Sequence, residues 1–390
     1  MSSEYLSAKE AARMLGVSVQ TLYVYVSRKG IRSKPIVGSR KRRYWKLDVD
    51  RVLRGESRTQ KSMPVATDSE ITLISESGLF YRGQNAADLA EHATLETTAA
   101  LLWGFPEEDV FGSVPPKVPA TFLRMQRLLA GESDINRATT FLPLFEEVNL
   151  KAYDLSQLGV ARTGADVLRT IAALAAGFDK PTAEPIHKLI ARHIGANPLQ
   201  TELIRRQLVL AADHGFQPGA LAVRTLASSG VTLWRSVTAG LSETLGGRAK
   251  LSRWGAIRRL LAEIIMSSTP TQPIIERIRA GEPVPGFQAP LYANGHPRAR
   301  SLLEFCATEL ARDPAFQRLT EALQFAKSVQ NLDPNFALAF LFVDTKTGLT
   351  AGRTLFHVGR SAGWIAHAIE QLRAGAPQRV LGVYKGELPR

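Results

Sequence analysis

Apolar positions recur with helical period in two short segments near the start of the chain, and a glycine separates the two segments. Residues 6–15 (LSAKEAARML) repeat apolar side chains every three or four positions, and Ser7 with Glu10 forms a capping box at their start. Gly16 can adopt the left-handed conformation that ends a helix, and Ser18 can cap the next one. The pattern predicts two helices joined by a tight turn.

A hairpin and a third helix are expected to follow. The second helix is expected to continue as far as Gly30. Residues 34–46 alternate around a Gly-Ser turn, which is typical of a β-hairpin, and residues 47–53 predict a third helix that begins near Asp48. Together these elements are the outline of a winged helix-turn-helix domain, which we assign to residues 1–54.

Long amphipathic segments of helical period dominate the remainder of the chain. Residues 55–69 are polar, contain Gly and Pro and show no periodicity, so we interpret them as a linker. Residues 71–83 alternate in a way that predicts one or two short strands. The helical segments include ADLAEHATLETTAALLW, DVLRTIAALAAG, ALAVRTLASS, AIRRLLAEIIMSS, RARSLLEFCATELARD and AGWIAHAIEQLRA. Residues 70–390 are therefore expected to form a mainly α-helical body.

The positive charge of the chain is concentrated near its start. The 390 residues carry a formal net charge of +13. Residues 1–64 hold 15 Lys and Arg against 5 Asp and Glu, net +10, whereas the remaining residues hold 34 against 31, net +3. A basic segment favours a polyanionic partner. Because this one coincides with the helix-turn-helix outline, the sequence predicts binding to double-stranded DNA.

The single cysteine and the lack of long apolar runs argue against disulfides, cysteine-based metal clusters and membrane spans. Cys306 is the single cysteine, so an intramolecular disulfide and a cysteine-based metal cluster are excluded. The histidine spacing suggests no metal site. No run of about 18 uncharged apolar residues occurs, and the first residues lack a signal-peptide pattern. We therefore expect a cytoplasmic protein with no membrane partner and no cofactor.

The second predicted helix supplies the candidate DNA-reading residues. In a helix-turn-helix, outward polar side chains near the start of this helix reach base edges in the major groove; here they are Gln20, Thr21 and Tyr23. The candidates for phosphate contact are Arg28, Lys29, Arg40, Lys41, Arg42 and Arg43. The alternative, that the basic run is only a solvated face, does not explain why it coincides with the helix-turn-helix pattern.

The segment YLSAKEAARMLGVSVQTLYVYVSRKGI, followed by RRYWKLDVDRVL, resembles the winged helix-turn-helix heads of the excisionase-like and MerR-type families. One such head offers a small interface with DNA. The resemblance therefore implies a dimer whose two heads contact two half-sites.

Segments of the body resemble the citrate synthase family in the right order. They are GLFYRG, DLAEHATLETTAALLWG, ADH, the NG.PRA segment, NLDPNF and GRSAGWIAHAIEQ. The resemblance implies an all-α fold of a large and a small helical domain over residues 70–390, with the small domain at approximately 215–325. It also implies a homodimer with an active site between the domains.

The resemblance implies a chemistry that joins acetyl-CoA to a 2-oxo dicarboxylate. In the family an Asp removes a methyl proton, one His stabilises the enol and a second His polarises the ketone. Asp333 of NLDPNF matches the Asp, whereas Ala249 and Ala289 stand where the two histidines are expected. Two of the three catalytic side chains are therefore expected to be missing. The alternative role for Asp333 is to cap the following helix.

The family's carboxylate-holding positions are retained. His214 of ADH, Arg298 of the Pro-Arg motif and Arg360 before AGWIAH match them, and guanidinium groups suit carboxylate geometry. The alternatives are that the two arginines form structural ion pairs and that the histidine is a core residue. We expect a site that can hold a di- or tricarboxylate, with acetyl-CoA as a further candidate substrate or ligand.

Three functions remain open from the sequence. The first is a DNA-binding transcriptional regulator whose body responds to a carboxylate or an acyl-CoA and has little or no synthase activity. The second is an active citrate synthase-type acyltransferase that condenses acetyl-CoA with oxaloacetate or a related 2-oxo acid. The third is a catalytically silent subunit that forms mixed dimers with an active citrate synthase.

Overall fold

The computed structural model consists of two compact units, Met1–Asp68 and Ser69–Arg390. The residues described are 5–36, 38–39, 41–53, 68–76, 78–129, 131–178, 180–245, 248–287, 292, 295–348 and 353–375. Residues 55–67 of the predicted linker 55–69 are not among the described residues.

The N-terminal unit combines a small sheet with three helices. The elements are β1 (Tyr5–Ser7), α1 (Ala8–Leu15), α2 (Val19–Arg28), β2 (Ser33–Pro35), β3 (Arg42–Trp45) and α3 (Lys46–Leu53). The strands pair antiparallel in the order β1-β3-β2. The predicted hairpin is thus present, and it has a third strand that the sequence pattern did not indicate.

Local chemistry explains where the first two helices begin and end. Ser7 and Glu10 form the predicted capping box of α1, and Gly16 closes that helix at φ 64°. The Ser18 side chain accepts the Thr21 backbone N–H at the start of α2. Each of these cap predictions is confirmed.

The third helix begins at Lys46, two residues before the predicted start near Asp48. Asp48 is buried, and its carboxylate accepts hydrogen bonds from the backbone and the guanidinium of Arg32. The carboxylate therefore ties α3 to the segment before β2 instead of capping the helix. Leu22 and Val49 are fully buried in the small apolar core beneath these helices.

The second unit is mainly α-helical, as the sequence predicts, and opens with a three-stranded antiparallel sheet in the order β4-β5-β6. The sheet and the first helices are β4 (Thr72–Ser75), β5 (Gly78–Tyr81), β6 (Gln84–Asn85), α4 (Ala86–His92), α5 (Leu95–Trp103), α6 (Glu107–Val110), α7 (Phe122–Leu128), α8 (Asp134–Val148), a 3₁₀ turn (Leu150–Tyr153) and α9 (Gln157–Ala175). The strands confirm the prediction for residues 71–83.

The later helices complete this unit. They are α10 (Ile186–Ile194), α11 (Pro198–Ala211), α12 (Pro218–Ala227), α13 (Leu233–Leu245), α14 (Arg248–Met266), α15 (Gln272–Arg279), α16 (Pro297–Glu309), α17 (Pro314–Gln330), α18 (Phe336–Thr347) and α19 (Thr354–Ala374). None of the described helices is both long and apolar enough to cross a membrane.

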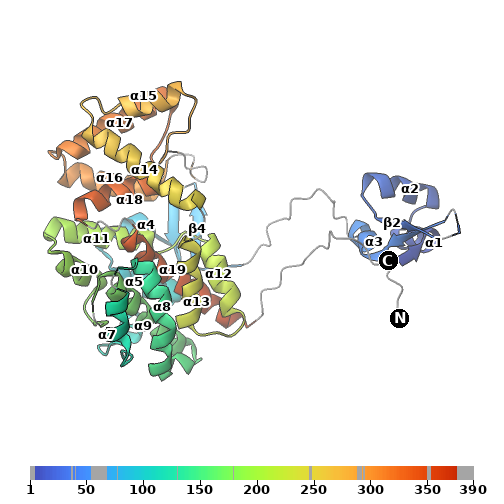
Figure 1. Cartoon of the computed structure of the whole chain (residues 1–390), viewed down its shortest axis with the longest axis horizontal. Helices are drawn as coiled ribbons and strands as arrows, with labels where there is room; N and C mark the ends of the chain where they lie inside the picture. The colour runs from blue at the N-terminus through green and yellow to red at the C-terminus, as the bar shows by residue number, and fades with distance from the viewer. Residues whose placement is uncertain are drawn as a thin grey trace. The chain divides into compact units, whose positions relative to one another are not determined.

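The helices of this unit form two groups (Figure 1). Helix α19 is buried along nearly all its length and packs against α5, α9, α11, α12 and α13. Helices α14 to α18 pack largely with one another and form the upper group in Figure 1. Helices α12 and α13, which fall within the predicted 215–325 portion, pack against α8 and α19. The predicted architecture of two helical bodies plus a helix-turn-helix head is confirmed.

Candidate functional site

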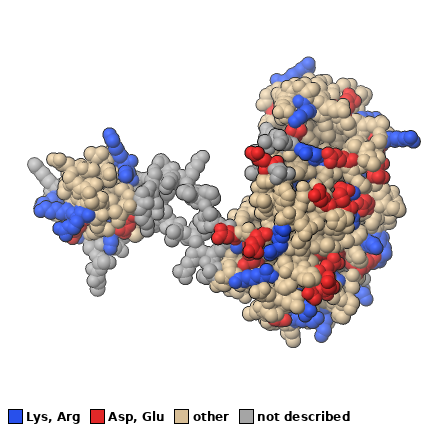
Figure 2. Space-filling model, turned by 180° about the vertical axis from the view of Figure 1, so that it is seen from behind, with Lys and Arg blue, Asp and Glu red and all other residues tan. Residues whose placement is uncertain are grey.

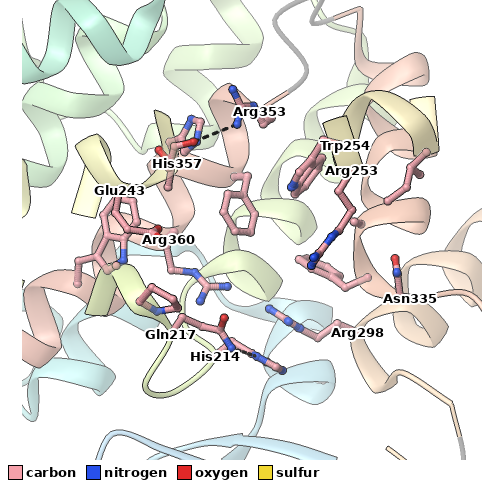
Figure 3. Close-up of a pocket in the computed structure, with 18 of the residues that line it drawn as sticks. His214, Gln217, Glu243, Arg253, Trp254, Arg298, Asn335, Arg353, His357 and Arg360 are labelled. Atoms are coloured by element: carbon pink, nitrogen blue, oxygen red, sulfur yellow. Dashed lines mark hydrogen bonds between the residues drawn. The ribbon is translucent and has the colours of Figure 1, made fainter. Parts of the chain in front are cut away.

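The second unit contains a cavity of about 360 Å³ between its two helical groups. His214, Arg298 and Arg360, which are far apart in the sequence, all line it. In Figure 3 the guanidinium groups of Arg298 and Arg360 reach toward the same open space. The walls come from α12, α13 and α19 on one side and from α14, α16 and α18 on the other. Both walls of the cavity thus contribute residues that the sequence predicts to bind carboxylates.

The end of helix α11 holds both arginines. The Arg298 guanidinium donates to the carbonyl oxygen of Leu210 at 3.0 Å, and Arg360 donates to that of Ala211 at 2.9 Å. Carbonyl groups in the last turn of a helix lack helical partners, so these donors satisfy them. Each contact uses only part of a guanidinium fork, which has five donors in all. Further donors therefore remain for a ligand.

The two arginines are buried without a carboxylate partner among the described residues. Arg298 is 4% exposed and Arg360 is 5% exposed, and no ion pair joins either of them to an acid in that part of the chain. Burial, and secondarily the charge of Arg360, lowers the pKa of Arg298 to about 10, and burial also lowers that of Arg360. Guanidinium groups stay protonated in proteins, so both side chains carry a positive charge. The alternative that the two arginines form structural ion pairs therefore has no support among the described residues. The cavity carries excess positive charge.

Asp213 is the buried acid nearest to this arrangement. Its carboxylate accepts from the hydroxyl of Thr72 at 2.6 Å and the backbone N–H of Gly215 at 2.7 Å, and it lies 3.4 Å from the ring of His367. Burial by itself raises the pKa of Asp213, but His367 and Arg360 outweigh burial and hold the pKa below its ordinary value. This acid is therefore already engaged by other groups.

His214 is buried beside the arginines. Its Nε2 lies 2.8 Å from the Tyr292 hydroxyl, and its Nδ1 lies 3.4 Å from the Gln217 amide. Burial, followed by the charges of Arg298 and Arg360, holds the pKa of His214 far below its usual value. The imidazole is therefore neutral, and it can donate one hydrogen bond and accept another.

Asp333 lies outside this cavity. It lines a neighbouring cavity of about 330 Å³, is partly exposed, and forms an ion pair of 2.7 Å with Lys327. The first turn of α18 is capped by Asn335, whose side chain accepts the Leu338 N–H, so the capping alternative assigns the wrong residue. His296 lines both cavities and is the group that connects them.

The described residues do not test the prediction that alanines replace the family's two catalytic histidines. Ala249 belongs to α14, but its side chain lies outside the described part of the structure, and Ala289 lies entirely outside it. His296 is an imidazole that lines both cavities, and its pKa is lowered to about 2 by burial and by Arg298. Its Nδ1 has no hydrogen-bond partner among the described residues.

Sequence reasoning missed several residues that line the cavity. His357 of α19 and Arg353, the N-cap residue of this helix, precede Arg360 at the spacing i−3 and i−7, so they lie on its side of the helix. Burial lowers the pKa of His357 to about 3, and its Nε2 is another unpartnered donor or acceptor within the described structure. Reading the helical period backward from Arg360 identifies both. Arg253 of α14, also in the lining, carries no such signal (Figure 3).

The candidate DNA-binding residues lie on the surface of the N-terminal unit. Gln20 and Tyr23 are exposed on α2, whereas the Thr21 hydroxyl contacts the Ser18 hydroxyl at 2.9 Å and belongs to the helix cap. The phosphate candidates Arg28, Lys29, Lys41, Arg42 and Arg43 are all exposed, and Arg40 lies outside the described residues. Figure 2 shows Lys and Arg gathered on this unit, while both signs of charge mix on the other.

The geometry defines a class: a helical protein with a buried, arginine-lined cavity between two helical groups and a helix-turn-helix unit at its N-terminus. Residues 133–381 match the family model of the citrate synthase C-terminal domain, and residues 5–57 match that of a helix-turn-helix domain. Because the first match covers more than half of the chain, the protein belongs to the citrate synthase family.

Curated relatives are similar to this chain over most of their length. Citrate synthase 2 of Bacillus subtilis is 23% identical over 346 residues, which cover 79% of this chain and 90% of that protein. The 2-methylcitrate synthase of Shewanella oneidensis is 25% identical over 361 residues, covering 81% and 91%. Both relatives carry names of synthases.

Solved structures show the same fold. Citrate synthase from Pyrobaculum aerophilum aligns with a TM-score of 0.71 at 20% identity, covering 84% of this chain and 92% of that one. Citrate synthase from Thermoplasma acidophilum, in a ternary complex with carboxymethyl coenzyme A and oxaloacetate, aligns with a TM-score of 0.66 at 18% identity, covering 84% and 96%.

Proposed function

We propose that this protein is a ligand-responsive DNA-binding regulator whose citrate-synthase-like body binds a small polycarboxylate or an acyl-CoA and has little or no synthase activity. The observation that carries the proposal is the pair of buried arginines, Arg298 and Arg360, that face one cavity without a carboxylate partner among the described residues. Burying charges without partners is costly. An anionic ligand would offset that cost.

The fold neighbours support this class of ligand. The Thermoplasma structure holds oxaloacetate and carboxymethyl coenzyme A, both of which are anions. In this chain His214, Arg298 and Arg360 offer one neutral imidazole and two guanidinium groups to the same cavity. Two guanidinium groups can each bind a carboxylate in a bidentate manner. A ligand carbonyl or hydroxyl that replaces the long 3.4 Å contact from Gln217 can hydrogen-bond Nδ1 of neutral His214.

Several features argue against efficient carbon-carbon bond formation. The family resemblance predicts Ala249 and Ala289 at the positions of the family's two catalytic histidines. Losing one oxyanion-type donor costs roughly 10²–10³ in turnover, so losing two independent donors removes about 10⁴–10⁶. The candidate base Asp333 is in addition paired with Lys327 and lines a different cavity from Arg360.

Regulation requires that the ligand distinguishes two conformations of the body, because equal affinity for both would shift nothing. The cavity lies between two helical groups that each contribute an arginine, Arg298 from α16 and Arg360 from α19. A dianion bound to both arginines would favour the conformation in which the groups are closest. A homodimer would pass this change to two helix-turn-helix heads that contact two half-sites of double-stranded DNA.

The test is a DNA-binding measurement on the full-length protein. DNA fragments from upstream of its own gene, and a random-sequence pool, are titrated at low salt with and without oxaloacetate, citrate or acetyl-CoA at constant ionic strength. The proposal predicts binding whose affinity changes with at least one of these anions. It fails if no DNA is retarded, or if none of the anions changes the affinity.

A second function is favoured by one observation: His296 lines one cavity with Asp333 and also lines the neighbouring cavity of Arg298 and Arg360. If His296 supplied the missing imidazole, the protein would be a citrate synthase-type acyltransferase. Release of free coenzyme A thiol from acetyl-CoA with oxaloacetate, abolished in Asp333→Asn, would support it. A rate at background level with micromolar enzyme removes it.

A further inference from the structure

One face of helix α2 is uncharged in its middle and exposes an aliphatic side chain. The exposed residues before Arg28 are Gln20, Tyr23, Val24 and Ser27, which recur at the spacing i, i+3, i+4 and i+7 and so form a single stripe. Val24 is 46% exposed and Tyr23 is 55% exposed. The opposite face carries Leu22, which is fully buried in the core of the unit. The stripe is therefore the surface that α2 turns outward.

Cations adjoin one end of this stripe, because exposed Arg28 and Lys29 stand at the C-terminal end of α2. Helix α2 itself contains no Asp or Glu. Exposed Arg42 and Arg43 lie on β3 of the same unit, where Arg43 interacts with exposed Glu10. An uncharged stripe with cations at its end suits a surface that places the cations on phosphates and the stripe on base edges.

The exposed Val24 at the centre of the stripe limits which base edges the stripe can contact favourably. Its methyl groups neither donate nor accept hydrogen bonds, so they gain nothing beside the polar edges of guanine, cytosine or adenine. The 5-methyl group of thymine is the apolar feature that the major groove presents. Val24 is also flanked by Tyr23, whose ring extends the apolar surface along the same stripe.

We infer that Val24 is a specificity residue that contacts the methyl group of one thymine in each half-site. This inference rests on the proposed DNA-binding function and adds the base that the head prefers at one position. Burying about one methyl group corresponds to ~0.8 kcal/mol, which is about a fourfold change in affinity. The effect requires the thymine methyl and is independent of the hydrogen bonds of the A·T pair.

The test uses deoxyuridine, which removes only the methyl group. A preferred site is first selected from a random duplex pool with the full-length protein, and each thymine is then replaced singly by deoxyuridine. The inference predicts that one replacement per half-site weakens binding about fourfold. Val24→Ala should weaken binding to the thymine site by a similar factor and should no longer distinguish thymine from deoxyuridine there.

The matched control is Val329→Ala, because Val329 of α17 is 52% exposed and lies in the other unit. It should leave both affinities unchanged. If the protein binds its selected site but no deoxyuridine replacement changes the affinity twofold, the inference is wrong and the proposed function stands. The same conclusion holds if Val24→Ala keeps the full discrimination. If no sequence is selected at all, both the inference and the proposed function are overturned.

Discussion

Replacing Arg360 by Met isolates the contribution of an unpaired buried cation to ligand binding. Methionine keeps much of the volume and removes the charge and the donors. In the free protein the Ala211 carbonyl loses its partner, which costs about 1–2 kcal/mol. The loss is partly offset because Arg298, whose pKa is lowered partly by Arg360, is relieved of a neighbouring positive charge. Asp213 in turn loses one of the cations that hold its pKa down, although His367 and Thr72 still engage its carboxylate. We therefore expect the unfolding free energy to fall by about 1–2 kcal/mol.

Ligand binding should respond much more strongly. Truncating one partner of a buried, hydrogen-bonded charge pair typically costs about 2–5 kcal/mol, which corresponds to a loss of roughly 30-fold to several thousand-fold in affinity. Isothermal titration with citrate and with oxaloacetate measures that loss. The rise in thermal midpoint caused by ligand should disappear in parallel.

The matched control is Arg224→Met. Arg224 is equally buried, but it has a carboxylate partner, Glu370, at 2.5 Å. Removing it leaves Glu370 short of a partner and should destabilise the fold by about 2–4 kcal/mol, while anion affinity stays within twofold. The reasoning is refuted if Arg360→Met keeps wild-type affinity, or if both variants lose stability and affinity to the same extent.

Four further predictions follow from individual contacts. Ser18→Ala removes the cap of α2 and should lower the stability of the N-terminal unit by about 1 kcal/mol in urea unfolding, and an unchanged midpoint contradicts it. Burial lowers the pKa of His357 to about 3, so below pH 6.5 the unfolded chain binds a proton that the folded protein does not bind. The stability of His357→Gln relative to wild type should therefore rise by about 2 kcal/mol from pH 7.5 to pH 5, and a pH-independent difference would contradict this. Burial raises the pKa of Asp344 to about 7 from 3.8, so between these pH values Asp344 destabilises the folded state more as the pH rises. The stability of Asp344→Asn relative to wild type should therefore rise by about 2–3 kcal/mol from pH 5 to pH 8, and a pH-independent difference is the contrary result. A Cβ on Gly363 would lie 2.4 Å from the Ala212 carbonyl oxygen, so Gly363→Ala should lower the thermal midpoint by several degrees, and a variant that melts like wild type would show that α19 can shift freely.

Local chemistry made the N-terminal unit predictable from its sequence. Ser7, Gly16 and Ser18 act on groups within four residues, so the sequence alone places the helix ends. Strand β1 escaped prediction because its three residues are too short for a period, and only pairing with β3 makes it a strand. The start of α3 was misplaced because Asp48, a good capping residue, makes a distant contact with Arg32.

The cavity was predictable only in part. His214, Arg298 and Arg360 were found through resemblance, since no periodicity connects positions that are more than 60 residues apart. Helical spacing from Arg360 would have added His357. The Asp333 ion pair with Lys327 bridges a helix end and the loop after it, and such a contact depends on side-chain placement that a sequence pattern does not encode.

An anion bound in the second unit is proposed to change the affinity of the helix-turn-helix unit for DNA. The deciding quantity is the dissociation constant for a selected DNA duplex, at fixed ionic strength, with and without saturating citrate, for wild type and Arg360→Met. Citrate should shift the wild-type constant several-fold and leave that of Arg360→Met unchanged. An equal response of the two proteins, or none in wild type although calorimetry shows citrate bound, would contradict it.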